Sequence, residues 1–137
     1  MSVVEDRLAQ LGLFVPDVVP PVAAYVPAVL AGQFAYTSGQ LPMRAGQLLA
    51  TGKVGAGVTP EDANELARVC ALNAIAALRS VLGDLDRVVR VVKVLGFVAS
   101  DPAFTGQPAV VNGASELLLA AFGGGGGRAS TRCPRRG

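Results

Sequence analysis

The apolar positions of this 137-residue chain recur at two spacings, and each spacing predicts a different kind of element. Spacings of three and four residues, typical of one helix face, occur in the segments 3–11, 60–82 and 107–122. Alternating or valine-rich runs, typical of strands, occupy 25–30, 33–38, 48–50 and 87–98. This order predicts an α+β domain in which a sheet carries two helices on one face.

The long central helix has the clearest start signal in the chain. Thr59 provides an N-cap hydroxyl, Pro60 suits the first helical position, and Glu61 and Asp62 lie over the positive end of the helix dipole. Gly83 is placed to end the helix. Its predicted apolar face consists of Ala63, Leu66, Ala67, Cys70, Ala74, Ala77, Leu78 and Val81.

The other two helices also have a glycine at the expected end. Gly12 follows the first helix, whose predicted inner side is Val4, Leu8 and Leu11. The last helix begins at Gln107 and ends before Gly123. Its predicted inward residues are Val111, Ala114, Leu117, Leu118 and Ala121.

The strand runs predict a hairpin and one long strand. Ala31 and Gly32 separate the first two runs, and a glycine there is typical of a tight hairpin turn. The run 87–98 is rich in valine and is broken by Arg90 and Lys93. Because helices cover only one face of the sheet, we expect another copy of the chain to meet the apolar side chains of the other face.

Composition supports one folded domain, since apolar residues make up 51% of the chain and charged residues only 16%. The uncharged stretch 18–43 contains four prolines and is not expected to span a membrane. The N-terminus, MSVVEDRL, has acids where an export signal has basic residues, so a cytoplasmic location is expected. Cys70 and Cys133 are too few for a disulfide framework.

Charge and residue types exclude several function classes. All ten acids lie before residue 117, so the chain up to Gly127 carries a net charge of −2 and lacks the basic footprint of nucleic-acid binding. The absence of histidine excludes Ser-His-Asp and Cys-His catalysis and leaves no plausible metal site. The glycine run 123–127 is not a phosphate loop, because no Lys-Ser/Thr pair follows it. No cofactor is expected.

Six sequence blocks carry a resemblance to a known family. They are YVPAV at 25–29, YTSGQLP at 36–42, GKVG at 52–55, CALNA at 70–74, VVKV with FV at 91–98, and VNGAS at 111–115. In this order they resemble the Rid family, also called the YjgF or endoribonuclease L-PSP family, over residues 1–122. The similarity is to a less-studied branch with an added N-terminal helix.

The resemblance implies a chorismate-mutase-like fold with a mixed sheet, a homotrimer, and pockets between neighbouring subunits. It implies an enamine or imine deaminase that converts 2-imino acids to 2-keto acids and ammonia, or a relative that has lost this activity. The alternative is a non-catalytic trimer that binds small carboxylates or acts as a regulatory protein. By motif match, Tyr25, Ser38, Gly39 and Asn112 would line the pocket.

The last fifteen residues, 123–137, depart from the family pattern. The family has an arginine and a final strand with an acid there, whereas this chain has GGGGGRASTRCPRRG, in which no strand is predicted. Arg128 is the candidate for the carboxylate-binding arginine. No acid follows Glu116, so no residue matches the family's water-activating acid and no catalytic residue is assigned.

Overall fold

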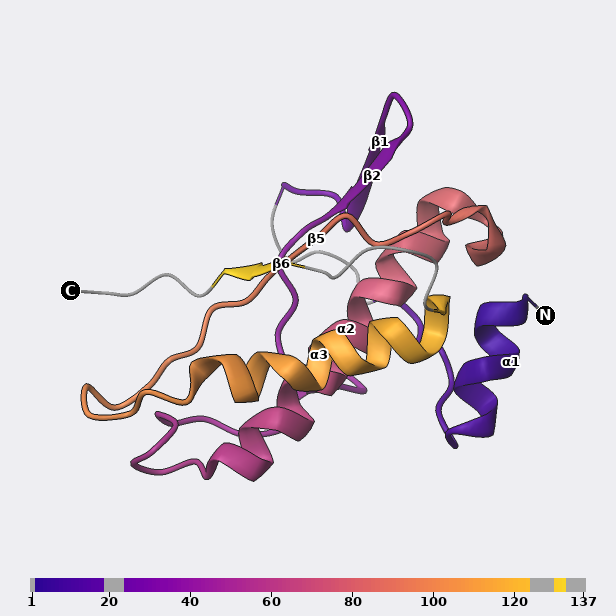
Figure 1. The fold of residues 1–137 in the computed structure, drawn as a ribbon. Coiled ribbons are helices and arrows are strands. Elements are labelled where there is room, and N and C mark those ends of the chain that lie inside the picture. Colours follow the sequence, from indigo (N-terminus) through magenta and orange to yellow (C-terminus); the bar gives the residue numbers. More distant parts are fainter. Residues whose placement is uncertain (1, 19–23, 124–129, 133–137) are drawn as a thin grey trace.

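Two long helices lie against each other at the centre, with the strands and a third helix around them (Figure 1). The computed structural model describes residues 2–18, 24–123 and 130–132. The helices of this part are α1 (Val3–Gln10), α2 (Pro60–Leu82) and α3 (Gln107–Phe122), and a 3-10 turn η1 (Leu85–Arg87) follows α2. The strands are β1 (Ala28–Ala31), β2 (Phe34–Thr37), β3 (Met43–Arg44), β4 (Gln47–Leu48), β5 (Lys93–Leu95) and β6 (Ser130–Arg132).

The predicted ends of the two long helices are confirmed. The Thr59 hydroxyl accepts a hydrogen bond from the Asp62 amide at 3.2 Å, with Pro60 in the first turn of α2. Gly83 ends α2 with a φ of 74°, which a residue with a side chain rarely adopts. Gly123 ends α3, also with a positive φ, of 78°.

The helices α2 and α3 approach closely where α3 has a glycine. A Cβ atom built on Gly113 would lie 2.1 Å from the backbone oxygen of Asn64 on α2. The Asn64 side chain donates a hydrogen bond to the Ala109 carbonyl at 2.9 Å, which ties α2 to the first turn of α3. The two helices therefore cross at a contact that only glycine permits.

The core consists of two clusters of buried side chains. The larger one joins α1, α2, η1 and α3 and contains Val4, Leu8, Ala71, Ile75, Leu85, Leu117 and Ala121. The smaller one, at the other end of the helix pair, contains Val54, Ala63 and Val110, with Phe104 packed against it. Fully burying a leucine or isoleucine side chain contributes about 1.5–3 kcal/mol, so the larger cluster is the main source of stability.

The predicted apolar face of α2 was partly wrong. Ala63 and Ala77 are buried, but Leu66, Ala67, Cys70, Ala74, Leu78 and Val81 are only half-buried. The most deeply buried residue of α2 is Ile75, next to Ala71 and Ala76. The face is rotated because α2 packs against α1 and η1 near its C-terminal end as well as against α3 along its length.

Helix α1 is fixed to the body through both its start and its buried face. The Asp86 carboxylate accepts hydrogen bonds from the Val3 amide at 2.9 Å and the Val4 amide at 3.3 Å. Leu8 is 0% exposed and Val4 is buried, as predicted. Leu11 was predicted to lie inside but is 48% exposed, because the helix ends at Gln10.

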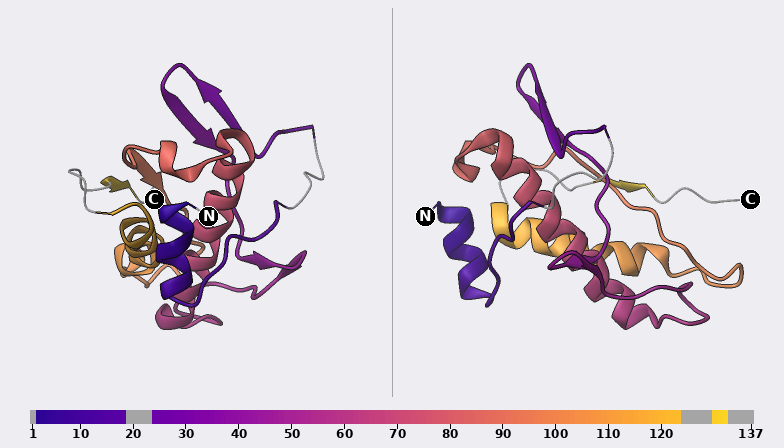
Figure 2. Two further views of the ribbon diagram at one scale, coloured as in Figure 1. Left: turned by 90° about the vertical axis from the view of Figure 1, so that its right-hand side faces the viewer. Right: turned by 180° about the vertical axis from the view of Figure 1, so that it is seen from behind.

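The strands form three separate two-stranded sheets within the described residues, whereas the sequence predicted one sheet. Antiparallel β1–β2 is the predicted hairpin, with Val29 opposite Tyr36 and Gly32 in the turn at a φ of 58°. The β3–β4 pair is a second small hairpin. Strands β1, β2, β5 and β6 lie on the same side of the α2–α3 pair in the front and rear views (Figures 1 and 2). The mixed α+β class is confirmed.

The long strand predicted at 87–98 was wrong in extent. Only Lys93–Leu95 is a strand, and it pairs with β6 in parallel, Lys93 opposite Ser130. A strand extends only as far as a neighbour supplies backbone partners, and β6 is three residues long.

Strand β6 itself contradicts the prediction that 123–137 contains no strand. Pairing uses backbone N–H and C=O groups, and the β-compatible Thr131 lies at its centre.

No helix among the described residues is both long enough and apolar enough to cross a lipid bilayer.

Candidate functional site

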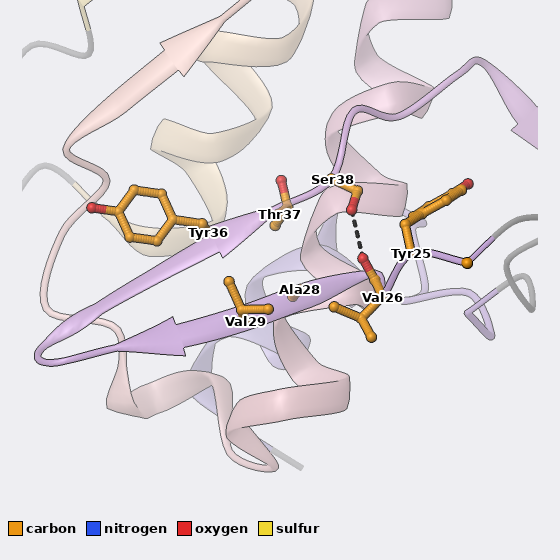
Figure 3. Close-up of a pocket in the computed structure, with 8 residues that line it drawn as sticks. Tyr25, Val26, Ala28, Val29, Tyr36, Thr37 and Ser38 are labelled. Carbon is orange, nitrogen blue, oxygen red and sulfur yellow. Dashed lines mark hydrogen bonds between the residues drawn. The ribbon is translucent and has the colours of Figure 1, made fainter.

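The candidate site is an open hollow of about 380 Å³ at the base of the β1–β2 hairpin (Figure 3). It is lined by Ala24, Tyr25, Val26, Ala28, Val29, Tyr36, Thr37 and Ser38. Ala28 is buried, while Tyr25 is 51% exposed and Tyr36 is 57% exposed. The hollow is therefore a surface depression with aromatic and aliphatic side chains and hydroxyl groups.

Strand pairing brings these residues together from two segments of the chain. Val29 pairs with Tyr36 and Ala28 pairs with Thr37. Ser38 extends this pairing by one step, because its amide donates to the Pro27 carbonyl at 2.9 Å. The segment 25–29 and the segment 36–38 consequently form one continuous surface.

The Ser38 hydroxyl has a defined orientation. It donates a hydrogen bond to the Val26 carbonyl at 2.5 Å, drawn as the dashed line in Figure 3. A hydroxyl oxygen that donates its proton still has lone pairs that accept hydrogen bonds. Ser38 can therefore accept a hydrogen bond from water or from an N–H group of a ligand.

The other predicted site residues lie in different places. Gly39 directly follows Ser38 and is exposed, and within the described part of the chain its amide donates to no other group. Asn112 is exposed on α3 and does not line the hollow. Arg128 lies outside the described residues. The single chain thus brings Tyr25 and Ser38 together, with Gly39 beside them, but not Asn112.

The sequence analysis did not assign Tyr36, Thr37 and Val29 to the site. Tyr36 and Thr37 belong to the same YTSGQLP block as Ser38, and Val29 belongs to the YVPAV block of Tyr25. The predicted hairpin turn would have aligned the two blocks, because strands joined by a tight turn pair outward from it. The hairpin register was therefore the sequence signal that could have assigned Tyr36, Thr37 and Val29 to the site.

A family comparison decides the identity of the fold. The model of the family described as "YjgF/chorismate mutase-like, putative endoribonuclease" matches residues 5–133. The chain belongs to the YjgF family. The match confirms the resemblance found in the sequence, and it continues through β6 into the tail.

Relatives of this YjgF-family chain come from distant organisms. Protein TCP17 of Trypanosoma cruzi is 43% identical over 120 residues, which cover 88% of this chain and 75% of that protein. The crystal structure of protein Atu1372 of Agrobacterium tumefaciens, with unknown function, has a TM-score of 0.83 at 40% identity and covers 96% of this chain and 79% of its own. The crystal structure described as a putative endoribonuclease of Shewanella oneidensis has a TM-score of 0.89 at 35% identity, with 95% and 85% covered.

The hollow of this YjgF-family chain contains no carboxylate, lysine or arginine among its lining residues. Its polar groups are the hydroxyls of Tyr25, Tyr36, Thr37 and Ser38. Within the described residues, no group of three or more histidine, cysteine, aspartate or glutamate side chains could hold a metal ion. The hollow can therefore orient a ligand by hydroxyl and backbone contacts, but it offers no group that takes a proton near neutral pH.

The thiol of Cys70 does not belong to this site. It lies half-buried on α2, and burial raises its pKa from 9.0 to about 11. Only the thiolate is a strong nucleophile or metal ligand, so a thiol with this pKa is unreactive near neutral pH. This agrees with the place of Cys70 in the predicted apolar face of the helix, where it acts as a small packing residue.

Proposed function

We propose that the protein binds small 2-imino or 2-oxo acids at the hairpin hollow and hydrolyses the imines to 2-oxo acids and ammonia. The observation that carries this proposal is the position of Tyr25 and Ser38. Both were selected by family resemblance alone, and both line one hollow. Gly39 directly follows Ser38 in the chain, and within the described residues its amide donates no hydrogen bond.

The reaction needs a water molecule and a group that accepts its proton. Water attacks the imine carbon, the C=N bond breaks, a C=O bond forms, and the nitrogen leaves as ammonia. Ser38 would hold the water by accepting a hydrogen bond, and the Gly39 amide would donate to the substrate carboxylate. The hollow contains no proton acceptor, and we propose that a neighbouring subunit supplies one.

The hairpin itself supports a site shared between subunits. It projects from the body in Figures 1 and 2, and its exposed large apolar side chains are Val29, Leu30, Phe34 and Tyr36. Contiguous exposed apolar surface marks interaction sites in proteins. We propose that neighbouring copies in a homotrimer cover this hairpin and close the open side of the hollow.

A second candidate is a trimer that binds small carboxylates without turning them over. It is favoured by the lack of any ionisable acid or base in the hollow and by the absence of an acid after Glu116. RNA cleavage, which the name of the Shewanella oneidensis relative suggests, has less support. The acidic body disfavours RNA binding, and the chain has no histidine for acid–base catalysis.

Turnover separates the two candidates. An amino-acid oxidase generates the imine in place, and semicarbazide traps whatever imine has not been hydrolysed. A deaminase lowers the rate of semicarbazone formation in proportion to its concentration, whereas a binding protein leaves this rate at background. If the rate stays at background but calorimetry shows pyruvate binding, the second candidate is correct.

Site variants test where the ligand binds. Ser38→Ala and Tyr25→Phe are expected to weaken binding or turnover about tenfold, because each removes one hydroxyl contact. The matched control is Ser80→Ala, since the Ser80 hydroxyl also donates to a backbone carbonyl, Ala77, at 2.6 Å but lies on α2 outside the hollow. If Ser38→Ala and Ser80→Ala weakened binding or turnover equally, the hollow would not be the ligand site.

A further inference from the structure

The loop between β2 and β3, residues 38–42, carries Ser38 and Gly39, and its residues 39–41 have no strand neighbour among the described residues. The large apolar side chain of the loop, that of Leu41, is 61% exposed, so it does not fix the loop by packing. We propose that Asn73 of α2 is a positioning residue that holds this loop, and through it the polar edge of the site. The effect of Asn73 on ligand binding rests on the proposed function. Its role in holding the loop does not.

The Asn73 side chain bridges a carbonyl of the loop, that of Leu41, and the carbonyl of Met43, the first residue of β3. Its Nδ2 atom lies 3.2 Å from the Leu41 oxygen and 2.9 Å from the Met43 oxygen. One amide nitrogen has two N–H donors, and here both are used. The C-terminal end of the loop and the start of β3 are thus attached to a helix of 23 residues, the longest helix of the described chain.

Other hydrogen bonds fix the two ends of the loop but not its distance from α2. At the β2 end, Ser38 is bonded to Pro27 and Val26, and the Gln40 side chain donates to the Ser38 carbonyl at 3.2 Å. At the β3 end, the Leu49 amide donates to the Pro42 carbonyl at 3.0 Å. Within the described residues, the hydrogen bond between this loop and a side chain of α2 is made by Asn73.

Only an asparagine side chain meets both requirements at this position. Aspartate has the same shape but only acceptors, so its carboxylate would face two carbonyl oxygens and repel them. Leucine has a similar size but no donor. Glutamine has two donors but is longer by one methylene, so it would displace the loop.

Asn64 is a natural control on the same helix. Its side chain also donates through Nδ2 to a backbone carbonyl, that of Ala109, at 2.9 Å. This bond joins α2 to α3, away from the loop 38–42 and from the hollow. The two asparagines therefore make the same kind of bond, but Asn73 binds the loop 38–42 and β3, whereas Asn64 binds α3.

The test compares Asn73→Ala and Asn64→Ala by hydrogen–deuterium exchange and by calorimetry with pyruvate. We expect exchange of the Met43 and Leu49 amides, which donate to the Leu41 and Pro42 carbonyls, to rise about tenfold in Asn73→Ala, and pyruvate affinity to fall about tenfold. In Asn64→Ala both quantities should stay within about twofold. Asn73→Gln, the milder change, should give intermediate values and keeps the test open if the alanine variant does not fold.

Three results would overturn the inference. Unchanged loop exchange in Asn73→Ala means that Asn73 does not hold the loop. Faster exchange with unchanged pyruvate affinity means that the loop does not position the site. A wild-type protein with neither turnover nor pyruvate binding overturns the proposed function and the link to a site, while the exchange data still show whether Asn73 holds the loop.

Discussion

Gly113 lies where α3 crosses α2, and its lack of a side chain sets the distance between the two helices. A Cβ atom there would be 2.1 Å from the Asn64 oxygen, and backbone cannot move away without separating the helices. Gly113→Ala is therefore expected to lower the free energy of unfolding by at least about 2 kcal/mol. Urea denaturation measures this loss.

The control for Gly113 is Gly57→Ala. A Cβ at Gly57 would meet nothing within 4 Å, and its backbone is not in the left-handed region. This variant should stay within about 0.5 kcal/mol of the wild type. A Gly113→Ala protein as stable as Gly57→Ala would show that the helix crossing is looser than described.

Cys70 makes stability depend on pH in the alkaline range. Burial raises its pKa from 9.0 to about 11, so between these values the folded chain keeps a proton that the unfolded chain releases. The contribution is complete below pH 9 and is lost as pH rises towards 11. Because Cys70 is half-buried, the loss should be no more than about 1–2 kcal/mol.

Cys70→Ala in a Cys133→Ser background isolates this contribution. The variant should lose less stability between pH 9 and 11 than its Cys70 parent in the same denaturation series. In the Cys133→Ser protein, the Cys70 thiol should react with a thiol reagent at pH 8 at least about tenfold more slowly in the folded state than in the unfolded state. A Cys70 that reacts equally fast in both states would contradict its raised pKa.

Single residues of the site could not be derived from chemistry alone. Ser38 and Gly39 look like an ordinary turn, and Tyr25 looks like an ordinary strand aromatic, so resemblance was needed to select them. The structure adds Tyr36 and Thr37 through hairpin pairing. The hydrogen bonds of Asn73 to the loop could not be predicted, because they join residues thirty or more positions apart.

Among the elements, α1 depends on contacts far away in the sequence. A capping box closes its first turn, with the Ser2 hydroxyl accepting from the Glu5 amide at 3.1 Å. Asp86 accepts from two further amides, those of Val3 and Val4. The ion pair of Glu5 with Arg79, at 3.4 Å, is partly exposed and contributes little.

Asp86→Ala is therefore expected to destabilise the protein by about 1–2 kcal/mol, comparable to the loss of an N-cap. Asp86→Asn keeps one acceptor oxygen and should lose about half as much. Chemical denaturation followed by circular dichroism gives both values. If Asp86→Ala matches the wild type, α1 is held by Leu8 and Val4 alone.

Helices were easier to predict than strands. The ends of α2 and α3 follow from local signals, namely Thr59, Pro60, Gly83 and Gly123, which act within one turn of the chain. A strand needs a neighbour, and the valine-rich run 87–98 does not contain its own partner. Strand β5 is therefore short, and β6 appeared where the side-chain pattern gave no indication.

At the scale of the whole molecule, much apolar surface remains exposed on strands and the segments beside them. Outside the hairpin, Val89 is 90% exposed, and Val92, Leu95 and Phe97 are also exposed. Together with the hairpin residues Leu30 and Phe34, they lie in or near the sequence of the β1–β2 and β5–β6 pairs, which have no third strand among the described residues. Such surface favours association of identical chains.

The mass of the protein in solution tests this account most directly, since the proposed site is completed by a neighbouring copy. Sedimentation equilibrium at micromolar concentration is expected to give three times the chain mass of 13.9 kDa. Replacing Leu30 and Phe34 at the hairpin tip by Ser should lower this mass and abolish pyruvate binding together. A wild-type protein that sediments as a monodisperse monomer would contradict both the trimer and the shared site.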